Sequence, residues 1–449
     1  MPKPDAPLRG MDDLLALFHE AEKPRERWLI GTEAERIAVS AADGAHLPYD
    51  GSVSVLTIFD RLIREQQWKP ESETEGGPII ALRRGNASVT LEPGSQIELS
   101  GAPYKTVHEG KSESDAHWAA LQPILEDLGL VWLGLGCHPF GSVDELGWVP
   151  KMRYAVMQRY MPTRGSMAAE MMTKTCTVQA NLDYASEDDA MRKVRVGLRA
   201  QPLVTAIFAN SPWEGGKRSG YRSYRGLIWL HMDPDRSGLL PFAWKDHPSY
   251  VDYVEWALDA PMFLLKRNGK PHYNTGQTFR SFLEEGFQGI KANQGDWASH
   301  LSTLFPEVRL KNTIECRGAD EQRPEMLFAL PALWKGLLYD ETSFRAFEGL
   351  VDPWAFPEVE RQRDALMRHG IRTKFMNREA VDWAGHLLEL AEAGLRRIGD
   401  RNEKGEDESV LLRPLRELLV TSRCPADVLL ERVGDDFPSR DAVIRVAGL

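Results

Sequence analysis

Two glutamates lie close together in a segment that is apolar at both ends. Glu33 and Glu35 are separated by one residue, and residues 28–30 and 37–39 on either side are apolar. Side chains two residues apart on a β-strand point to the same face. We therefore expect residues 27–39 to form a strand that presents both carboxylates to one side. The flanks are too apolar for an ordinary solvated edge, so the acidic face should line a cleft.

Other segments repeat this arrangement. Glu92 and Glu98 lie in residues 86–100, which read as two short strands around a Pro-Gly turn. In residues 173–183, Gln179 and Asn181 share one face and apolar residues take the other. Such alternation is typical of antiparallel strands with one face on a core.

Residues 307–317 also alternate, and Glu315 and Arg317 share the polar face there. Cys176 and Cys316 fall on the apolar faces of their segments, so we interpret them as small core residues. The candidate acids of the whole chain are Glu33, Glu35, Glu92, Glu98 and Glu315.

Acids crowded into one cleft repel each other, so a compensating cation is expected. Because the set contains no histidine or cysteine, that cation should be a hard ion, Mg²⁺ or Mn²⁺, and not zinc. For any one glutamate the alternative is an exposed carboxylate or an ion-pair partner. The pattern alone names no reaction.

Arginines supply the opposite charge. Arg153 lies among aromatic residues and methionines in residues 148–166, and Arg225 lies in the segment 220–229. An arginine binds a carboxylate or a phosphate through a two-pronged fork. The alternative for each is a surface arginine whose aliphatic stem covers apolar surface.

The elements that position these residues form a sheet backed by helices. Residues 106–130 and 187–209 have helical patterns, and the chain after Pro353 is almost wholly helical.

Composition narrows the function classes. The 449 residues are 42% hydrophobic and carry a net charge of -11, which excludes fibrous and wholly disordered chains. A diffuse acidic excess argues against a nucleic-acid or anionic-membrane partner. The four cysteines are far apart, without zinc-site spacing, and the stretch MPKPDAPLRGMDD has no apolar segment. We expect a soluble, cytoplasmic protein without a signal peptide.

Taken together, the motifs resemble those of the glutamate–cysteine ligase family of the plant and proteobacterial type. The similar stretches span most of the chain in the family's order. They are GTEAER (31–36), SVTLEPGSQIELSGAP (88–103), KMRYAVMQRYMPTRGSMAAEMMTKTCTVQANLDY (151–184), FANSPWEGGKRSGYRSYRGLIW (208–229) and DWASHLSTLFPEVRLKNTIECRGAD (296–320).

The resemblance implies an α+β fold of the glutamine-synthetase-like type. In that fold a curved, mostly antiparallel sheet forms a funnel-shaped active site and helices cover its outside. We expect residues 1–449 to form one catalytic domain. Residues 25–350 would be its sheet-based core, and residues 351–449 a helical C-terminal region packed on that core.

The resemblance also implies a reaction. ATP would phosphorylate the γ-carboxylate of L-glutamate, and the amine of L-cysteine would displace phosphate from the γ-glutamyl phosphate. The product is γ-glutamylcysteine, the first intermediate of glutathione synthesis. The alternatives are a γ-glutamyl ligase with another amine acceptor and a magnesium-dependent phosphohydrolase. The state of assembly, monomer or homodimer, stays open.

The resemblance assigns roles to individual residues. Arg153 and Arg225 match positions that hold the glutamate substrate. Arg317, from its position on the face of Glu315, is expected to contact phosphate. The expected ligands of the Mg²⁺ or Mn²⁺ ions around the ATP phosphates are Glu33, Glu35, Glu92, Glu98, Gln179 and Glu315.

Overall fold

The computed structural model describes residues 3–267, 270–434 and 439–449. The N-terminal stretch discussed above therefore begins two residues before the described chain. Within these residues, nine strands form one sheet in the order β14-β15-β7-β1-β5-β4-β3-β2, with β6 paired to β1. The strands are β1 (Ile30–Ser40), β2 (Lys69–Ser72), β3 (Ile79–Arg84), β4 (Ala87–Leu91), β5 (Ile97–Ser100), β6 (Leu130–Leu133), β7 (Val178–Leu182), β14 (Val308–Leu310) and β15 (Ile314–Cys316).

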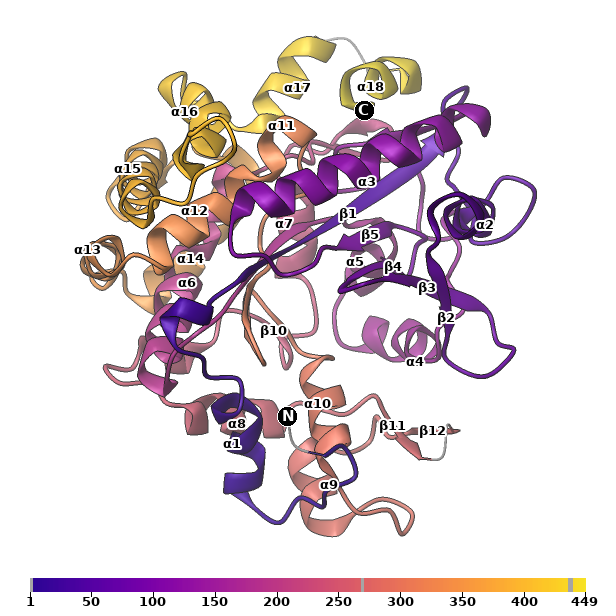
Figure 1. Cartoon of the computed structure of the whole chain (residues 1–449), viewed down its shortest axis with the longest axis vertical. Coiled ribbons are helices and arrows are strands. Elements are labelled where there is room, and N and C mark those ends of the chain that lie inside the picture. The colour runs from indigo at the N-terminus through magenta and orange to yellow at the C-terminus, as the bar shows by residue number, and fades with distance from the viewer. Residues whose placement is uncertain (1–2, 268–269, 435–438) are drawn as a thin grey trace.

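The long strand β1 is the centre of this sheet (Figure 1). It pairs antiparallel with β5 and with β7 along its first half and with β6 along its second half. The other neighbouring strands are antiparallel as well. Short two-stranded ribbons complete the strand content: β8 (Trp213–Glu214) with β9 (Lys217–Arg218), β10 (Ser237–Gly238) with β13 (Phe305–Pro306), β11 (Leu264–Arg267) with β12 (Lys270–Tyr273), and β16 (Lys374–Phe375) with β17 (Arg378–Glu379).

Helices cover the sheet and extend beyond it. In the first half of the chain they are α1 (Met11–His19), α2 (Val55–Gln66), α3 (Val107–Asp127), α4 (Met152–Tyr160), α5 (Ala168–Lys174), α6 (Glu187–Ile207) and α7 (Tyr224–Leu230). The later ones are α8 (Tyr250–Asp259), α9 (Phe279–Glu285), α10 (Gln294–Leu301), α11 (Pro324–Leu327), α12 (Ala329–Leu338), α13 (Glu341–Val351), α14 (Phe356–His369), α15 (Ala380–Ile398), α16 (Arg413–Val420), α17 (Pro425–Val433) and α18 (Arg440–Ala447).

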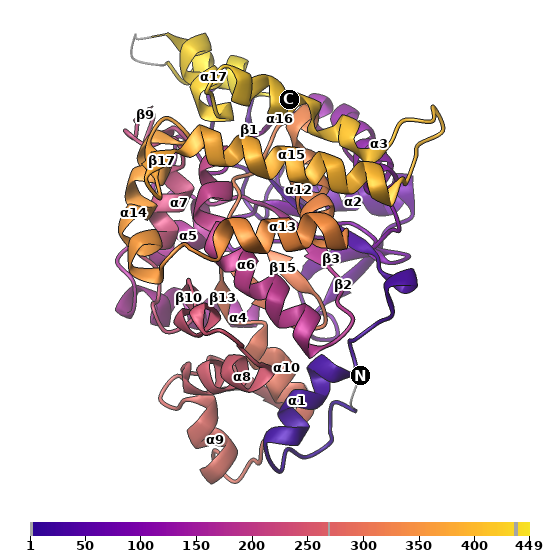
Figure 2. The ribbon, with the colours of Figure 1, turned by 90° about the vertical axis from the view of Figure 1, so that its left-hand side faces the viewer.

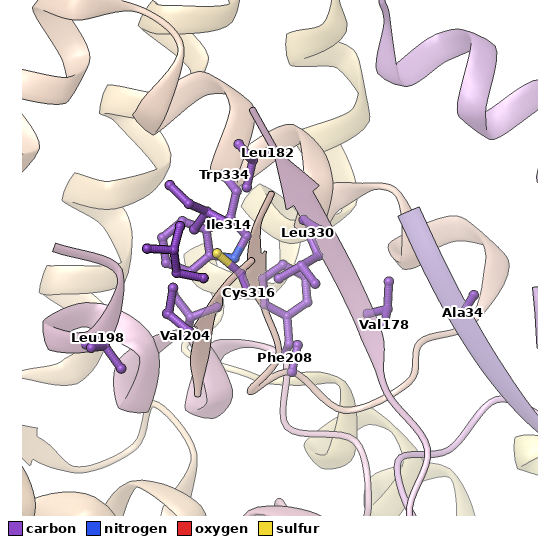
Figure 3. Close-up of a cluster of buried hydrophobic side chains, with 14 of the residues drawn as sticks. Ala34, Val178, Leu182, Leu198, Val204, Phe208, Ile314, Cys316, Leu330 and Trp334 are labelled. Atoms are coloured by element: carbon purple, nitrogen blue, oxygen red, sulfur yellow. The ribbon is translucent and has the colours of Figure 1, made fainter. Parts of the chain in front are cut away.

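Helices α6 and α12 pack on the apolar face of β7 and β15. Val178, Leu182 and Cys316 point into this layer and are buried, as the alternation in the sequence predicts (Figure 3). Helices α13 and α15 pack outside α12, so this side of the molecule has several helical layers (Figure 2). The acidic face of the sheet is therefore the opposite one.

Two expected strands are shorter than their sequence pattern. In residues 173–183 only β7 is a strand, because residues up to Lys174 belong to helix α5. Residues 307–317 form a hairpin, since the amide of Lys311 bonds to the carbonyl of Thr313 and reverses the chain. Glu315 still shares the polar face with Arg309, because the two residues lie directly opposite each other in the hairpin.

The helix predictions for 106–130, 187–209 and the region after Pro353 agree with α3, α6 and α14 to α18. None of the helices in the described part of the chain combines the length and the apolar character that crossing a bilayer requires.

Candidate active site

A cluster of carboxylates lies where β1 and β5 pair. Glu35 and Glu98 are directly opposite each other in the ladder, and Glu92 follows β4 at the start of the turn to β5. One carboxylate oxygen from each of the three glutamates lies within 4.8 Å of the others. The Pro-Gly turn thus brings Glu92 back beside two acids of the central strands.

Hydrogen bonds hold these carboxylates in place. The hydroxyls of Thr90 and Ser100 donate to the two oxygens of Glu98 at 2.6 Å each, and the amide of Thr177 donates to Glu35 at 3.0 Å. Burial and the neighbouring acids raise the pKa of Glu35 and of Glu92. Burial is the larger cause, and the mutual repulsion of the three acids adds to it.

A second group of residues forms on the other side of β1. Glu33 lies directly opposite Gln179 of β7, and its carboxylate accepts a hydrogen bond from Asn181 at 3.1 Å. Burial, together with the charge of Glu315, raises the pKa of Glu33 to about 8. The six expected metal ligands thus fall into two groups, Glu35 with Glu92 and Glu98, and Glu33 with Gln179 and Glu315.

Glu315 differs from the other acids because cations surround it. Arg309 donates to the two oxygens of its carboxylate, from Nη2 at 2.9 Å and from Nε at 3.1 Å, and Arg317 donates to one of these oxygens. Burial by itself would raise the pKa of Glu315, but Arg309, Arg317 and Lys311 together lower it well below its usual value. Arg317 also donates to the side-chain oxygen of Gln179 at 3.1 Å, so it links Glu315 to Gln179.

Arg153 projects from the first turn of α4 toward Glu92. The nearby Tyr154 and Glu92 raise the pKa of the Arg153 guanidinium against its burial. Lys151, just before α4, donates to the carbonyl of Leu91 at 2.6 Å, which ties this helix to the end of β4. Two cations from one short segment therefore face the carboxylate cluster.

Arg225 lies in the first turn of α7 and is buried. Its guanidinium donates to the carbonyls of Gly318 and Arg317 at 3.0 and 2.9 Å, and its Nε has no hydrogen-bond partner among the described residues. An unpaired buried donor is costly, so this edge of Arg225 is suited to an anionic ligand.

Six of the predicted site residues line one small cavity of about 60 Å³, and Glu33, Glu98 and Glu315 lie outside its lining. Sequence reasoning missed its aromatic walls, Trp229 and Phe305, whose rings flank Arg317 at 5.9 Å each. Trp229 is four residues after Arg225 on a helix, a spacing that signals a shared face. Phe305 gave no such signal. The predicted site residues that line the cavity are Glu35, Glu92, Gln179, Arg153, Arg225 and Arg317.

The donor set fits a hard divalent cation. Glu35, Glu92 and Glu98 offer oxygen ligands only, which is the chemistry that Mg²⁺ and Mn²⁺ prefer. Burial first and the neighbouring acids second raise the pKa of Glu35 and of Glu92, and a bound cation would favour their charged forms. Arginines across the same cavity can hold anionic groups at the same time.

An antiparallel sheet backed by helices thus presents carboxylates and arginines to one cavity. The chain belongs to glutamate-cysteine ligase family 2, whose model matches residues 29–446.

Comparison with known proteins gives the same family. The chain is 40% identical over 429 residues to the chloroplastic glutamate–cysteine ligase of Brassica juncea. This matched region covers 95% of this chain and 81% of the Brassica protein. The chain is 39% identical over 422 residues to the chloroplastic glutamate–cysteine ligase B of Oryza sativa subsp. japonica, covering 93% and 83%. The crystal structure of the Francisella tularensis glutamate–cysteine ligase in complex with AMP has a similar fold, with a TM-score of 0.57 at 11% identity, covering 94% of this chain and 87% of that one.

This membership confirms the family resemblance, and the Francisella structure confirms the α+β fold class. It also confirms the predictions of a ligase and of ATP-dependent γ-glutamylcysteine formation, the first step of glutathione synthesis.

The prediction of a cytoplasmic protein is wrong, because the similar plant enzymes are chloroplastic. That prediction depended on composition, scattered cysteines and a polar N-terminal stretch. These features bear on membranes and secretion, and they do not separate the cytosol from the interior of a plastid.

Proposed function

We propose that the cavity between the carboxylate cluster and the arginines is where glutamate is activated by ATP and joined to cysteine. One observation carries this proposal: Glu35, Glu92 and Glu98 converge within 4.8 Å, and the first two line the same cavity as three arginines, Arg153, Arg225 and Arg317. Membership of the glutamate–cysteine ligase family supports it.

The reaction needs both kinds of group. A carboxylate is a poor acyl donor, and transfer of a phosphoryl group from ATP to the glutamate γ-carboxylate turns it into an acyl phosphate. The neutral amine of cysteine then attacks the acyl carbon, the amide bond forms and phosphate leaves. Phosphoryl transfer depends on positioning and on neutralisation of charge more than on covalent help from the protein.

We assign the divalent cations to the acidic residues. Glu35, Glu92 and Glu98 would hold Mg²⁺ or Mn²⁺, with Glu33, Gln179 and Glu315 as a second set of oxygen donors on the other side of β1. The ion supplies charge neutralisation for the phosphate oxygens when it is bound.

We assign the anionic substrate groups to the arginines. Arg225, with its free Nε, and Arg153, beside Glu92, would hold the carboxylates of glutamate. Arg317 is held between Gln179 and Glu315, with two aromatic rings beside it, and would contact the transferred phosphoryl group. Trp229 and Phe305 make part of the cavity wall apolar, which helps to keep water from the acyl phosphate.

The test is to measure ADP release with ATP and MgCl₂, adding glutamate and then each candidate amine in turn, and to identify the product by mass spectrometry. Turnover only with glutamate and cysteine, giving γ-glutamylcysteine, is the expected result. Preference for another amine would change the acceptor and keep the mechanism. ADP release without either amino acid would favour a phosphohydrolase and overturn the proposal.

A further inference from the structure

Helix α7 is short, yet it carries two side chains that line the proposed active site, Arg225 and Trp229. A helix of seven residues makes few hydrogen bonds of its own, so other parts of the chain must fix where it begins. Arg225 is the second residue of this helix. The groups that hold the start of α7 therefore decide where the Arg225 guanidinium lies.

Two serine hydroxyls accept hydrogen bonds from the first backbone amides of α7. Ser223, the residue before the helix, accepts from the amide of Gly226 at 2.9 Å. Ser211, from an earlier segment of the chain, accepts from the amide of Arg225 at 3.0 Å. A serine hydroxyl that accepts in this way can also donate its own hydrogen. Each of the two serines therefore has one hydrogen left to donate.

Both of these hydrogens go to one carboxylate, that of Asp320. Ser223 donates to Oδ1 at 2.8 Å, and Ser211 donates to Oδ2 at 2.7 Å. The amide of Asn210 also donates to Oδ2, at 2.7 Å. Because an ionised carboxylate only accepts, both hydroxyls turn their hydrogens toward it and keep a lone pair for the helix. Asp320 thereby sets the direction of both serine hydroxyls.

Close packing fixes Asp320 itself. The residue is fully buried, and a Cβ added to Gly136 would lie 2.5 Å from the Cβ and Cγ of Asp320. The backbone of Asp320 forms an antiparallel bridge with Thr177, whose amide donates to Glu35 at 3.0 Å. Asp320 therefore links the sheet that carries the acids to the helix that carries Arg225.

The segment that contains Asp320 also holds the other end of the Arg225 side chain. The Arg225 guanidinium donates to the carbonyls of Arg317 and Gly318 at 2.9 and 3.0 Å. Burial lowers the pKa of Arg225, and the charge of Asp320 opposes this more strongly than that of Glu35. Residues 317–320 thus act on both the backbone and the guanidinium of Arg225.

We propose that Asp320 is a positioning residue for Arg225 in the ligase reaction. Asp320 lies outside the lining of the cavity, so it acts through Ser211 and Ser223 and not by contact with a substrate. This inference rests on the proposed role of Arg225 in holding glutamate. A shifted start of α7 would then weaken glutamate binding and leave the binding of ATP, through cations on the acids of the sheet, largely unchanged.

Asp320→Asn tests the proposal at nearly unchanged side-chain size. The amide nitrogen of an asparagine carries hydrogens of its own, so it cannot accept from the group that it faces. We expect the KM for glutamate to rise about 10-fold, with kcat and the KM for ATP within about twofold of the wild type, because only glutamate binding depends on Arg225. Ser211→Ala, which deletes one of the two hydroxyls, should raise the glutamate KM by a smaller factor.

A double-mutant cycle with Arg225→Lys separates positioning from a general loss of structure. If Asp320 acts through Arg225, Asp320→Asn should lower kcat/KM for glutamate by less than about twofold in a chain that already carries Arg225→Lys. Asp189→Asn is the matched control, since Asp189 is also a buried carboxylate at the start of a helix, α6, and lies outside the lining of the cavity. It should leave the glutamate KM unchanged. Thermal unfolding verifies that each variant is folded.

Two results would overturn the proposal while Arg225 keeps its role. They are full additivity of Asp320→Asn and Arg225→Lys, and a rise in the KM for ATP equal to the rise for glutamate. Either would make Asp320 a residue of the fold only. Ser211→Ala gives the same cycle if Asp320→Asn does not fold. Unchanged kinetics in Arg225→Lys alone would instead overturn the role of Arg225 in the proposed function, and this inference with it.

Discussion

At the scale of single residues, the main feature is that the buried acids differ in how closely cations pair with them. Glu315 is paired with Arg309 and Arg317, which lower its pKa, whereas burial and neighbouring acids raise the pKa of Glu33, Glu35 and Glu92. An acid that is already paired is less available to a cation. Because their oxygens also lie within 4.8 Å of one another, Glu35, Glu92 and Glu98 are the stronger group of proposed metal ligands.

Glu35→Gln tests that assignment. Losing one of three converging carboxylates should lower activity about 100-fold and raise the MgCl₂ concentration for half-maximal activity at least 10-fold, as with other losses at a metal site. Activity measured against MgCl₂ concentration, after removal of metal with EDTA, checks this. Glu71→Gln, an exposed glutamate at the edge of the same sheet, is the control. A wild-type metal dependence would remove Glu35 from the metal site.

Arg225→Lys tests the substrate role of the arginine fork. A lysine keeps the charge and loses the two-pronged geometry, so kcat/KM for glutamate should fall about 100-fold, which is about 3 kcal/mol. Steady-state kinetics with varied glutamate measures this, and thermal unfolding verifies that the fold is intact. Arg159→Ala, an exposed arginine of α4, should change neither. Unchanged kinetics in Arg225→Lys would show that Arg225 does not hold glutamate.

At the scale of elements, the helical layer behind the sheet depends on a close helix crossing. A Cβ added to Gly394 of α15 would lie 2.0 Å from the backbone oxygen of Gly336 in α12. The two backbones therefore meet directly, and α12 in turn packs on β7 and β1. The position of the central strands is thus coupled to a pair of glycines in the helical layer behind the sheet.

Gly394→Ala should lower the free energy of unfolding by about 1–3 kcal/mol, because the added methyl group forces the helices apart. Gly385→Ala, on the same helix with nothing within 4 Å of an added Cβ, should raise it by about 0.5–1 kcal/mol through helix propensity alone. Urea unfolding of both variants checks the pair. Equal stabilisation by both would show that the crossing tolerates a wider spacing.

At the scale of the whole molecule, buried histidines make stability depend on pH. Burial lowers the pKa of His117 and of His300 to about 3. Both are neutral in the folded protein, while the unfolded chain takes up protons near pH 6.5. Their contribution is therefore fully present above pH 6.5 and is lost as the pH falls toward 3.

For each of these histidines, the loss between pH 7 and pH 5 should be about 2 kcal/mol. In His117→Phe, the difference in unfolding free energy between pH 7 and pH 5 should shrink by that amount. Urea unfolding at the two pH values measures it. His386→Gln, at an exposed position on α15, should leave the difference unchanged. An unchanged difference in His117→Phe would mean that His117 takes up as many protons in the folded protein as in the unfolded chain between pH 7 and pH 5.

Much of the site was predictable because it lies on strands. A strand alternates with period two, so Glu33 and Glu35, or Gln179 and Asn181, must share a face whatever surrounds them. The family resemblance supplied the reaction and the proposed roles of Arg153 and Arg225. The supporting hydroxyls of Thr90 and Ser100 were also within reach of the same reasoning, since each shares a face with Glu98.

The sequence by itself determined the family and the strand faces, and it indicated the kind of chemistry that the acids and arginines are proposed to do. Only the tertiary structure decided which acids meet. Glu35 faces Glu98 because β5 pairs with β1 on one side, and Glu33 faces Gln179 because β7 pairs on the other. Alternation along a strand sets which way a side chain points, whereas its neighbours depend on strand order and register, which long-range packing determines.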